Sequence, residues 1–265
     1  MIKIMGIVNL TPDSFWAPSR SSIDNSIPRI ASMVADGADM IDLGAVSTRP
    51  GAEDVSVEEE WRRLEPTLKS LADRAVVEQY GLAGVEFSID TTSSAIVRRA
   101  FDTFGRFIVN DISAGEDDPE MLGTVASLGL PYVAMHKRGN PRTMDSLCEP
   151  DCDIIEVLNA YFAEFSRKAG DCGIRDWILD PGLGFAKTAE QNVEILRRLP
   201  ELNRYGRPLL IGAADKRFTC GDTEKYHLMA LRGGADILRV HDVDAAYRTY
   251  TQYKEEHAGG EDNPE

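Results

Sequence analysis

The sequence lacks the features that mark membrane and secreted proteins. No stretch of about 18 consecutive apolar residues occurs in the 265-residue chain, so no transmembrane helix is expected. The opening segment, MIKIMGIVNLTPDS, has too short an apolar run for a signal peptide and no small-residue cleavage site. We therefore expect no membrane partner and predict a cytoplasmic protein.

Cysteine is scarce, and its spacing excludes two kinds of site. Cys148, Cys152, Cys172 and Cys220 show neither CxxC spacing nor the paired histidines of a zinc knuckle. They give no sign of a disulfide framework either, so four reduced thiols are expected. The sequence also has no P-loop, GxGxxG, HxH metal pair or hydrolase triad motif. The sequence therefore gives no support for a P-loop kinase, a Rossmann dehydrogenase or a hydrolase.

Basic residues are few relative to acidic ones. The chain has 29 Lys and Arg against 44 Asp and Glu, which gives a formal net charge of −15. Such a charge argues against nucleic-acid binding and against an anionic membrane surface. A small polyanion would have to be bound by a few local cations.

Apolar runs and amphipathic stretches alternate along the chain. Each run is almost continuously hydrophobic and is bounded by Gly, Pro, Asp or Asn, which predicts a buried parallel strand. The eight runs are residues 3–10, 40–47, 85–91, 107–113, 130–136, 176–182, 207–213 and 235–242. Helical patterns occur between them, at 23–35, 58–71, 154–168 and 188–199, and the last begins with a capping box from Thr188 to Gln191.

Eight strand–helix units in a chain of this length predict an α/β fold, a (β/α)8 TIM barrel of one domain. A doubly wound sheet would need a different strand count and usually has a Gly-rich turn after its first strand, where this chain has NLTPDSF. We expect the barrel to span residues 1–257. Residues 258–265 have nothing apolar to bury and are expected to form a disordered tail.

Six polar residues interrupt or end the apolar runs: Asn9, Asp90, Asn110, Asp180, Arg239 and His241. Each would be costly to bury without a partner. One interpretation is six independent structural hydrogen bonds. The favoured one is a shared polar pocket at the carboxyl ends of the strands, where barrel enzymes carry their active sites. His136 also ends a strand, and a lone histidine there is more often structural.

Two kinds of chemistry follow from this set. Asp90, Asn110 and Asp180 offer two carboxylates and an amide, which suits the amino-pyrimidine edge of a flat heterocycle. Donors and cations suit a phosphate or pyrophosphate, which this fold commonly binds after strands 7 and 8. These donors are Asn9, Arg49, Lys216, Arg239 and His241.

Seven strings then carry a resemblance to a known family. The strings are IMGIVNLTPDSF, DLGAVSTRPGA, SIDT, VNDIS, MHKRGNPRTM, DPGLGFAKT and LRVHDV. In order and spacing, over residues 3–245, they resemble the dihydropteroate synthases of folate biosynthesis. The resemblance implies a barrel enzyme, a transferase that is usually dimeric. It implies condensation of 6-hydroxymethyl-7,8-dihydropterin pyrophosphate with p-aminobenzoate, commonly with Mg2+, to give 7,8-dihydropteroate and pyrophosphate.

The resemblance also implies roles for individual residues. The pterin pocket would be formed by Asp90, Asn110, Asp180 and Lys216, with Met135 and Phe185 against the ring. The pyrophosphate would contact Asn9, Arg239 and His241, and Asn9 would also touch Mg2+. Thr48 and Arg49 match a mobile second loop and 11–15 match the first, both closing over the aminobenzoate. The catalytic set implied is Asn9, Asp90, Lys216, Arg239 and His241.

One segment departs from the family pattern. Residues 212–218 read GAADKRF where the family reads close to GxSRKSF, so Gly212 and Lys216 match but Arg217 replaces a serine that contacts the aminobenzoate carboxylate. Arg217 offers a charge-assisted substitute, whereas Asp215 would repel an anion. The stretch from Phe218 to Gly233 is also about a dozen residues shorter than the family pattern, so the following helix is expected to be truncated or its loop removed.

Three functional interpretations remain open from the sequence. The favoured one is an active dihydropteroate synthase with a modified aminobenzoate site. The second is a diverged paralogue that binds a pterin pyrophosphate but uses another acceptor or has lost catalysis. The third is a pterin-binding module like the methyltetrahydrofolate-binding barrel of corrinoid methyltransferases, a class that lacks the TPDSF and STRPG loops present here.

Overall fold

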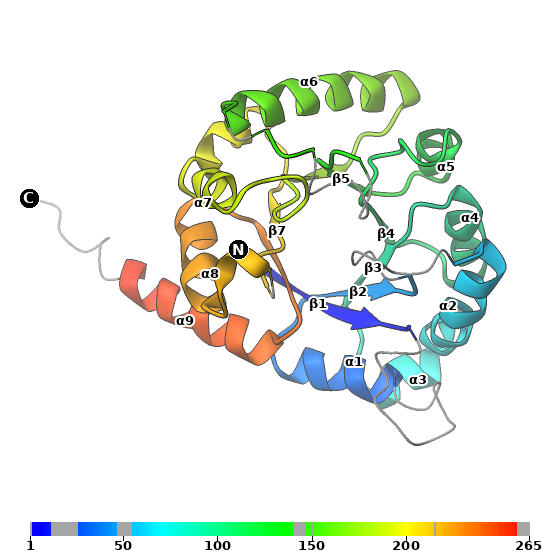
Figure 1. Ribbon diagram of the computed structural model, residues 1–265. Helices are drawn as coiled ribbons and strands as arrows, with labels where there is room; N and C mark the ends of the chain where they lie inside the picture. The colour runs from blue at the N-terminus through cyan, green and yellow to red at the C-terminus, as the bar shows by residue number, and fades with distance from the viewer. Residues whose placement is uncertain are drawn as a thin grey trace, which may run out of the picture.

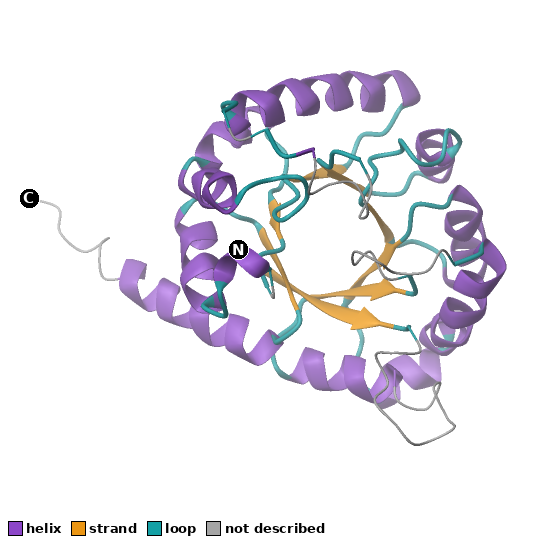
Figure 2. Ribbon diagram, in the orientation of Figure 1, coloured by secondary structure: helices purple, strands orange, loops and turns teal. Residues whose placement is uncertain are grey.

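The computed structural model describes residues 2–11, 26–46, 55–139, 147–149, 151–214 and 216–258. Eight parallel strands form a ring at its centre, and helices form a second ring outside it (Figures 1 and 2). The strands are β1 Lys3–Asn9, β2 Met40–Gly44, β3 Glu86–Asp90, β4 Ile108–Asp111, β5 Tyr132–Met135, β6 Trp177–Asp180, β7 Leu210–Ile211 and β8 Ile237–Val240. Each lies within one of the eight apolar runs, which confirms the predicted TIM barrel of one domain.

The strands pair in the order β6-β5-β4-β3-β2-β1-β8-β7. The two end strands then meet through a parallel bridge between Leu179 and Leu209. The Leu179 N–H donates to the Pro208 carbonyl oxygen at 2.9 Å there. We call this junction the β6–β7 seam. It closes the barrel and brings the end of β6 beside the end of β7.

The helices follow the predicted alternation. They are α1 Ser26–Ala35, α2 Val57–Ala72, α3 Arg74–Gln79, α4 Ser94–Phe104, α5 Met121–Leu128, α6 Ile154–Cys172, α7 Ala189–Arg197, α8 Thr223–Arg232 and α9 Val243–Ala258, with 3-10 turns η3 Leu199–Tyr205 and η4 Arg217–Thr219. The four helical patterns are confirmed, although 23–25 lie outside the described residues. Thr188 and Gln191 form the predicted capping box at the start of α7.

Burial on both faces explains the continuous hydrophobicity of the strands. One face points into the barrel, where a compact layer of buried side chains gathers. This layer is Met5, Met40, Ile108, Val133, Ile178, Leu210 and Ile237. The other face packs against the helices in a larger core. Each fully buried side chain of this size contributes about 1.5–3 kcal/mol relative to exposure.

The structure also bears on three other predictions, for the cysteines, the segment after β7 and the end of the domain. The four cysteines form no disulfide, as predicted. The shortened segment after β7 still forms η4 and then α8, a helix of 10 residues. Helix α9 includes Ala258, one residue past the expected domain end, and the expected tail from 259 to 265 lies outside the described residues.

None of the helices in the described part of the chain is long and apolar enough to cross a membrane.

Candidate active site

The predicted polar residues gather at one rim of the barrel. Asn9, Asp90 and Asp180 are the last residues of their strands, and Asn110 is one residue from the end of β4. Because all eight strands are parallel, their carboxyl ends share this rim. An ideal Cβ placed on Gly44 at the end of β2 would lie 3.7 Å from Asn9 Oδ1 and 3.9 Å from Asp90 Oδ2. Asn9 and Asp90 thus lie on the two sides of Gly44.

Asp42 of β2 is the centre of the rim network. Its side chain is fully buried, at 0% exposure. Its Oδ1 accepts from Ser88 Oγ at 2.7 Å, and its Oδ2 accepts from Asn110 Nδ2 at 3.0 Å and from Arg239 Nε at 2.7 Å. Asp42 was not among the site residues predicted from the sequence. The signal was present, because Asp42 interrupts the apolar run MIDLG as the six selected residues interrupt theirs.

Arg239 of β8 links Asp42 to Asp90. Its Nη2 donates to Asp90 Oδ2 at 2.9 Å. Burial lowers the pKa of Arg239, but Asp42 and Asp90 outweigh that effect and raise it, so the guanidinium stays charged. Burial raises the pKa of Asp90 to about 7, although Arg239 acts to lower it. The rim therefore holds a permanent cation beside a carboxylate that titrates near neutrality.

Asp180 and Lys216 lie on the two sides of the β6–β7 seam, close enough for their charges to interact. Burial raises the pKa of Asp180, while the Gly182 N–H, at 2.8 Å from Oδ1, and the charges of Arg239 and Lys216 act to lower it. Burial lowers the pKa of Lys216, with a further lowering from Arg239. Lys216 Nζ lies 4.7 Å from the centre of the Phe185 ring, within range of a cation–π contact. A carboxylate, an ammonium and an aromatic face thus converge here.

The loop from Asp180 to Phe185 depends on glycine. Gly182 has φ +66°, and a Cβ there would lie 2.1 Å from the His136 carbonyl oxygen. Gly184 has φ +79°, and its Cβ would lie 3.2 Å from Lys216 Cδ. A side chain at Gly182 would clash with the His136 carbonyl oxygen. Both glycines also have a positive φ, a backbone conformation that favours glycine. The two glycines in DPGLGF therefore let this loop pack against the end of β5 and against Lys216.

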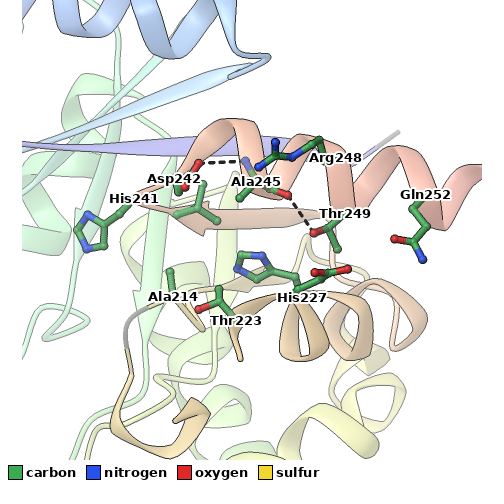
Figure 3. Close-up of a pocket in the computed structure, with 11 residues that line it drawn as sticks. Ala214, Thr223, His227, His241, Asp242, Ala245, Arg248, Thr249 and Gln252 are labelled. Atoms are coloured by element: carbon green, nitrogen blue, oxygen red, sulfur yellow. Dashed lines mark hydrogen bonds between the residues drawn. The ribbon is translucent and has the colours of Figure 1, made fainter. Parts of the chain in front are cut away.

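His241 follows β8 and borders a cavity of about 450 Å³ between the starts of α8 and α9 (Figure 3). Ala214 and Thr223 line one side, and Asp242 lines the other. This is the place after strands 7 and 8 where the fold commonly binds phosphate. Both helix starts are already capped by carboxylates, since Asp222 accepts from Lys225 N–H and Asp242 from Ala245 N–H.

The remaining predicted residues separate into three groups. Met135 ends β5 and is buried beside the Gly182 loop, 3.3 Å from the position of a Gly182 Cβ. Gly212 follows β7, and Arg217 begins η4 with an exposed side chain. Thr48, Arg49, Asp215 and residues 12–15 of the first loop lie outside the described residues. His136 is buried, as expected for a structural histidine.

The donor set tests whether a metal fits the rim. No group of three or more His, Cys, Asp or Glu side chains in the described ranges is placed to hold a metal ion. Asn9 offers one amide oxygen. Mg2+ commonly keeps several waters and binds through one or two protein oxygens together with substrate phosphates. The residues present therefore fit a Mg2+ ion that arrives with a diphosphate, and they do not form an all-protein cage.

Comparison with known proteins assigns the family. A family model described as pterin binding enzyme matches residues 5–241. The dihydropteroate synthase of Synechocystis sp. is 41% identical, over 91% of this chain and 86% of its own length. That of Escherichia coli strain K12 is 36% identical with the same coverage.

Solved structures agree with this assignment. The dihydropteroate synthase of Xanthomonas albilineans with 4-aminobenzoic acid has a TM-score of 0.83 at 33% identity, covering 97% of this chain and 93% of that one. The Yersinia pestis enzyme in complex with a sulfonamide drug has a TM-score of 0.87 at 30% identity, covering 97% and 94%. The chain therefore belongs to the pterin-binding enzyme family, as a member of its dihydropteroate synthases.

Proposed function

We propose that this protein joins 6-hydroxymethyl-7,8-dihydropterin pyrophosphate to p-aminobenzoate, giving 7,8-dihydropteroate and pyrophosphate. The observation that carries the proposal is the buried network in which Asp42 holds both Arg239 and Asn110, with Asp90 on the other side of Arg239. A rim of this kind provides fixed acceptors and a fixed cation in one water-poor site.

The acceptors suit a pterin. Asp180 is a buried carboxylate at the rim and Asp90 a partly buried one, and each can accept from a ring N–H or an exocyclic NH2. Asn110 donates its Nδ2 hydrogen to Asp42, which orients its Oδ1 as a further acceptor. Phe185 offers an apolar face beside Lys216. The pterin ring would thus be recognised along its amino-pyrimidine edge.

The chemistry requires no protein nucleophile. The C–O bond between the exocyclic carbon of the pterin and the diphosphate breaks, and that electron pair leaves with pyrophosphate. The aniline nitrogen of p-aminobenzoate forms the new C–N bond and loses one proton to solvent. Arg239, which stays charged, stabilises the negative charge that grows on the leaving group. His241 and Asn9 complete the proposed pyrophosphate site.

We propose Mg2+ as a cofactor that enters with the diphosphate and contacts Asn9. When bound, Mg2+ neutralises charge on the leaving pyrophosphate. Asn9 would orient the diphosphate against the end of β1, next to Asp90.

The proposed binding site for p-aminobenzoate is the part of the proposal that experiments can test most directly. Arg217 stands where the family has a serine, and it lies exposed on η4. An exposed arginine at this place offers a cation to the carboxylate of p-aminobenzoate. Thr48 and Arg49 are proposed as further contacts to this substrate. The alternative is a diverged enzyme that binds the pterin pyrophosphate and uses a different acceptor.

Two wider properties are proposed along with the activity. We propose a homodimer, on the family resemblance alone, and light scattering of the purified protein would test it. We also propose a cytoplasmic location, which is supported by four cysteines that form no disulfide, since thiols stay reduced in that compartment.

The deciding experiment measures pyrophosphate release and dihydropteroate formation with Mg2+, with and without p-aminobenzoate. Coupled release and product formation would establish the synthase. Tight pterin binding with release that does not depend on p-aminobenzoate would favour the diverged enzyme. Asp180→Ala serves as the negative control, because the proposal predicts that this variant folds and binds no pterin.

A further inference from the structure

Lys187 is a buried lysine that the proposed chemistry does not use. It stands between the Asp180–Phe185 loop and α7, with 7% of the residue exposed. Its ammonium lies 3.0 Å from the Gly182 carbonyl oxygen, 3.0 Å from the Phe185 carbonyl oxygen and 2.9 Å from His136 Nδ1. A longer contact of 3.4 Å reaches the His136 carbonyl oxygen. All three ammonium hydrogens therefore have acceptors, and every acceptor belongs to this loop or to the end of β5.

The histidine partner is locked as an acceptor. Burial lowers the pKa of His136 to about 2, with further lowering from Lys187 and Arg138, so its ring is neutral at physiological pH. Burial also lowers the pKa of Lys187, to about 7, while Asp180 acts to raise it. In its ammonium form Lys187 can only donate, so Nδ1 accepts and the ring proton lies on Nε2. The His136 ring also packs edge-on against Tyr161, with centroids 4.8 Å apart, which fixes the ring plane. The lysine thus links the loop to His136, which directly follows β5.

We infer that Lys187 is a positioning residue, whose ammonium holds the Asp180–Phe185 loop in the shape that presents Asp180 and Phe185 to the pterin. This inference rests on the proposed function. The two loop carbonyls it binds, from Gly182 and Phe185, lie on either side of Gly184, the glycine that packs against Lys216. Without the ammonium, each of these carbonyl oxygens would lose one hydrogen bond, and the Gly182 oxygen would keep the one from the Phe185 N–H.

Other hydrogen bonds also hold the loop, so the effect of Lys187 on pterin affinity must be separated from its effect on stability. Asn192 of α7 accepts from the Gly184 N–H at 2.8 Å, and the Phe185 N–H donates to the Gly182 carbonyl oxygen at 3.1 Å. If these bonds alone fixed the loop, removing the ammonium would lower stability and leave pterin affinity unchanged. The inference instead predicts a selective loss of pterin affinity.

The test compares Lys187→Met, which keeps length without donors, with Lys187→Gln, which keeps two amide hydrogens. Tyr132→Phe is the matched control. It removes a fully buried hydrogen bond, 2.6 Å to Asp111, at the start of the same strand, β5. For each folded variant, thermal unfolding, the KM for each substrate and calorimetric binding of the pterin substrate alone are measured.

We expect Lys187→Met to raise the pterin KM and Kd by about tenfold or more, with the p-aminobenzoate KM changed by less than about twofold. Lys187→Gln should lie between this variant and the wild type. Tyr132→Phe should lose stability without a change in pterin KM. A folded Lys187→Met protein with wild-type pterin affinity would overturn the inference, as would equal losses for both substrates.

A substrate-free readout separates this inference from the proposed function. Hydrogen exchange at the amides of residues 182–185 should accelerate in Lys187→Met and stay unchanged in Tyr132→Phe. If the wild type binds pterin but makes no dihydropteroate, the proposed activity fails while the pterin Kd still tests Lys187. If exchange in the loop is the same in Lys187→Met and the wild type, Lys187 does not hold the loop and the inference fails by itself.

Discussion

Two guanidinium nitrogens of Arg239 contact a single carboxylate oxygen of Asp42, Nε at 2.7 Å and Nη2 at 2.6 Å. Residue 42 lies on β2 and residue 239 on β8, on either side of β1 in the sheet. The pair therefore spans β1 at the rim and fixes the direction in which Arg239 points. In this orientation the guanidinium of Arg239 lies beside Asp90, and Nη2 also donates a hydrogen bond to Asp90 Oδ2.

Asp42→Asn should weaken both folding and turnover. The substitution removes the main counter-charge of a buried arginine, and breaking such a pair costs about 3–5 kcal/mol when no other partner remains. Asp90 remains near Arg239, so we expect about 2–3 kcal/mol, measured by urea unfolding. kcat should fall by about 100-fold, because Arg239, the cation proposed to stabilise the departing pyrophosphate, is no longer held in place.

Ser88→Ala is the matched control for this variant. It removes only the hydroxyl that donates to Asp42 Oδ1 and leaves the ion pair intact. We expect a loss of about 1 kcal/mol in stability and little change in kcat. Equal effects of the two substitutions on kcat would contradict the role given to the ion pair.

Lys216→Ala and Asp180→Ala should each abolish pterin binding while the barrel stays folded. Asp180 is proposed to accept from the pterin ring, and Lys216 lies over Phe185 at the same place. Calorimetry with the pterin substrate measures the affinity, and circular dichroism checks the fold. Retained affinity in either variant would remove that residue from the pocket.

Asp90 should make folding stability depend on pH in a defined window. Burial raises its pKa to about 7 in the folded protein, above about 4 for an unfolded aspartate. Between these values the folded state binds more protons than the unfolded state, so the contribution of Asp90 to stability falls as pH rises from about 4 to 7. The difference in unfolding free energy between wild type and Asp90→Asn should show this slope.

The same titration should appear in kinetics. A protonated Asp90 is a poorer acceptor for a pterin N–H, so kcat/KM for the pterin substrate should rise as pH increases through about 7. Asp90→Asn should lose this limb of the profile. A profile that keeps its inflection in the variant would assign the titration to another group.

Gly182→Ala should disrupt the loop, because the added Cβ would lie 2.1 Å from the His136 carbonyl oxygen and φ is +66°. We expect a stability loss above about 2 kcal/mol together with weaker pterin binding. Gly123→Ala is the contrasting variant. Gly123 is exposed on α5 with nothing within 4 Å of an added Cβ, so it should gain up to about 1 kcal/mol.

The changed acceptor segment gives a prediction about substrate choice. The double substitution Asp215→Arg with Arg217→Ser brings the segment closer to the family pattern. We expect it to change the p-aminobenzoate KM more than the pterin KM, as measured by steady-state kinetics. If both constants stay fixed, these two residues have no part in acceptor binding.

The fold was readable from the sequence because parallel strands buried on both faces appear as continuous apolar runs, and all eight lie where those runs are. The site was only partly readable. Asp42 carried the same signal as the selected residues, namely a carboxylate inside the apolar run MIDLG. Lys187 carried none, because a lysine after a Gly-rich turn resembles any solvated loop residue. Its burial results from the way the β6–α7 loop folds back against His136, which no local pattern encodes.

The β6–β7 seam has a consequence for how ligands act on the whole molecule. This junction is closed by one bridge between Leu179 and Leu209, and β7 itself spans two residues. Asp180 stands directly above it on one side and Lys216 follows β7 on the other. A pterin held by both side chains, as proposed, would link β6 and β7 across a junction that has a single bridge. A ligand at 100 times its Kd adds about 2.7 kcal/mol to the free energy of unfolding, so pterin binding should stabilise the whole barrel through this junction.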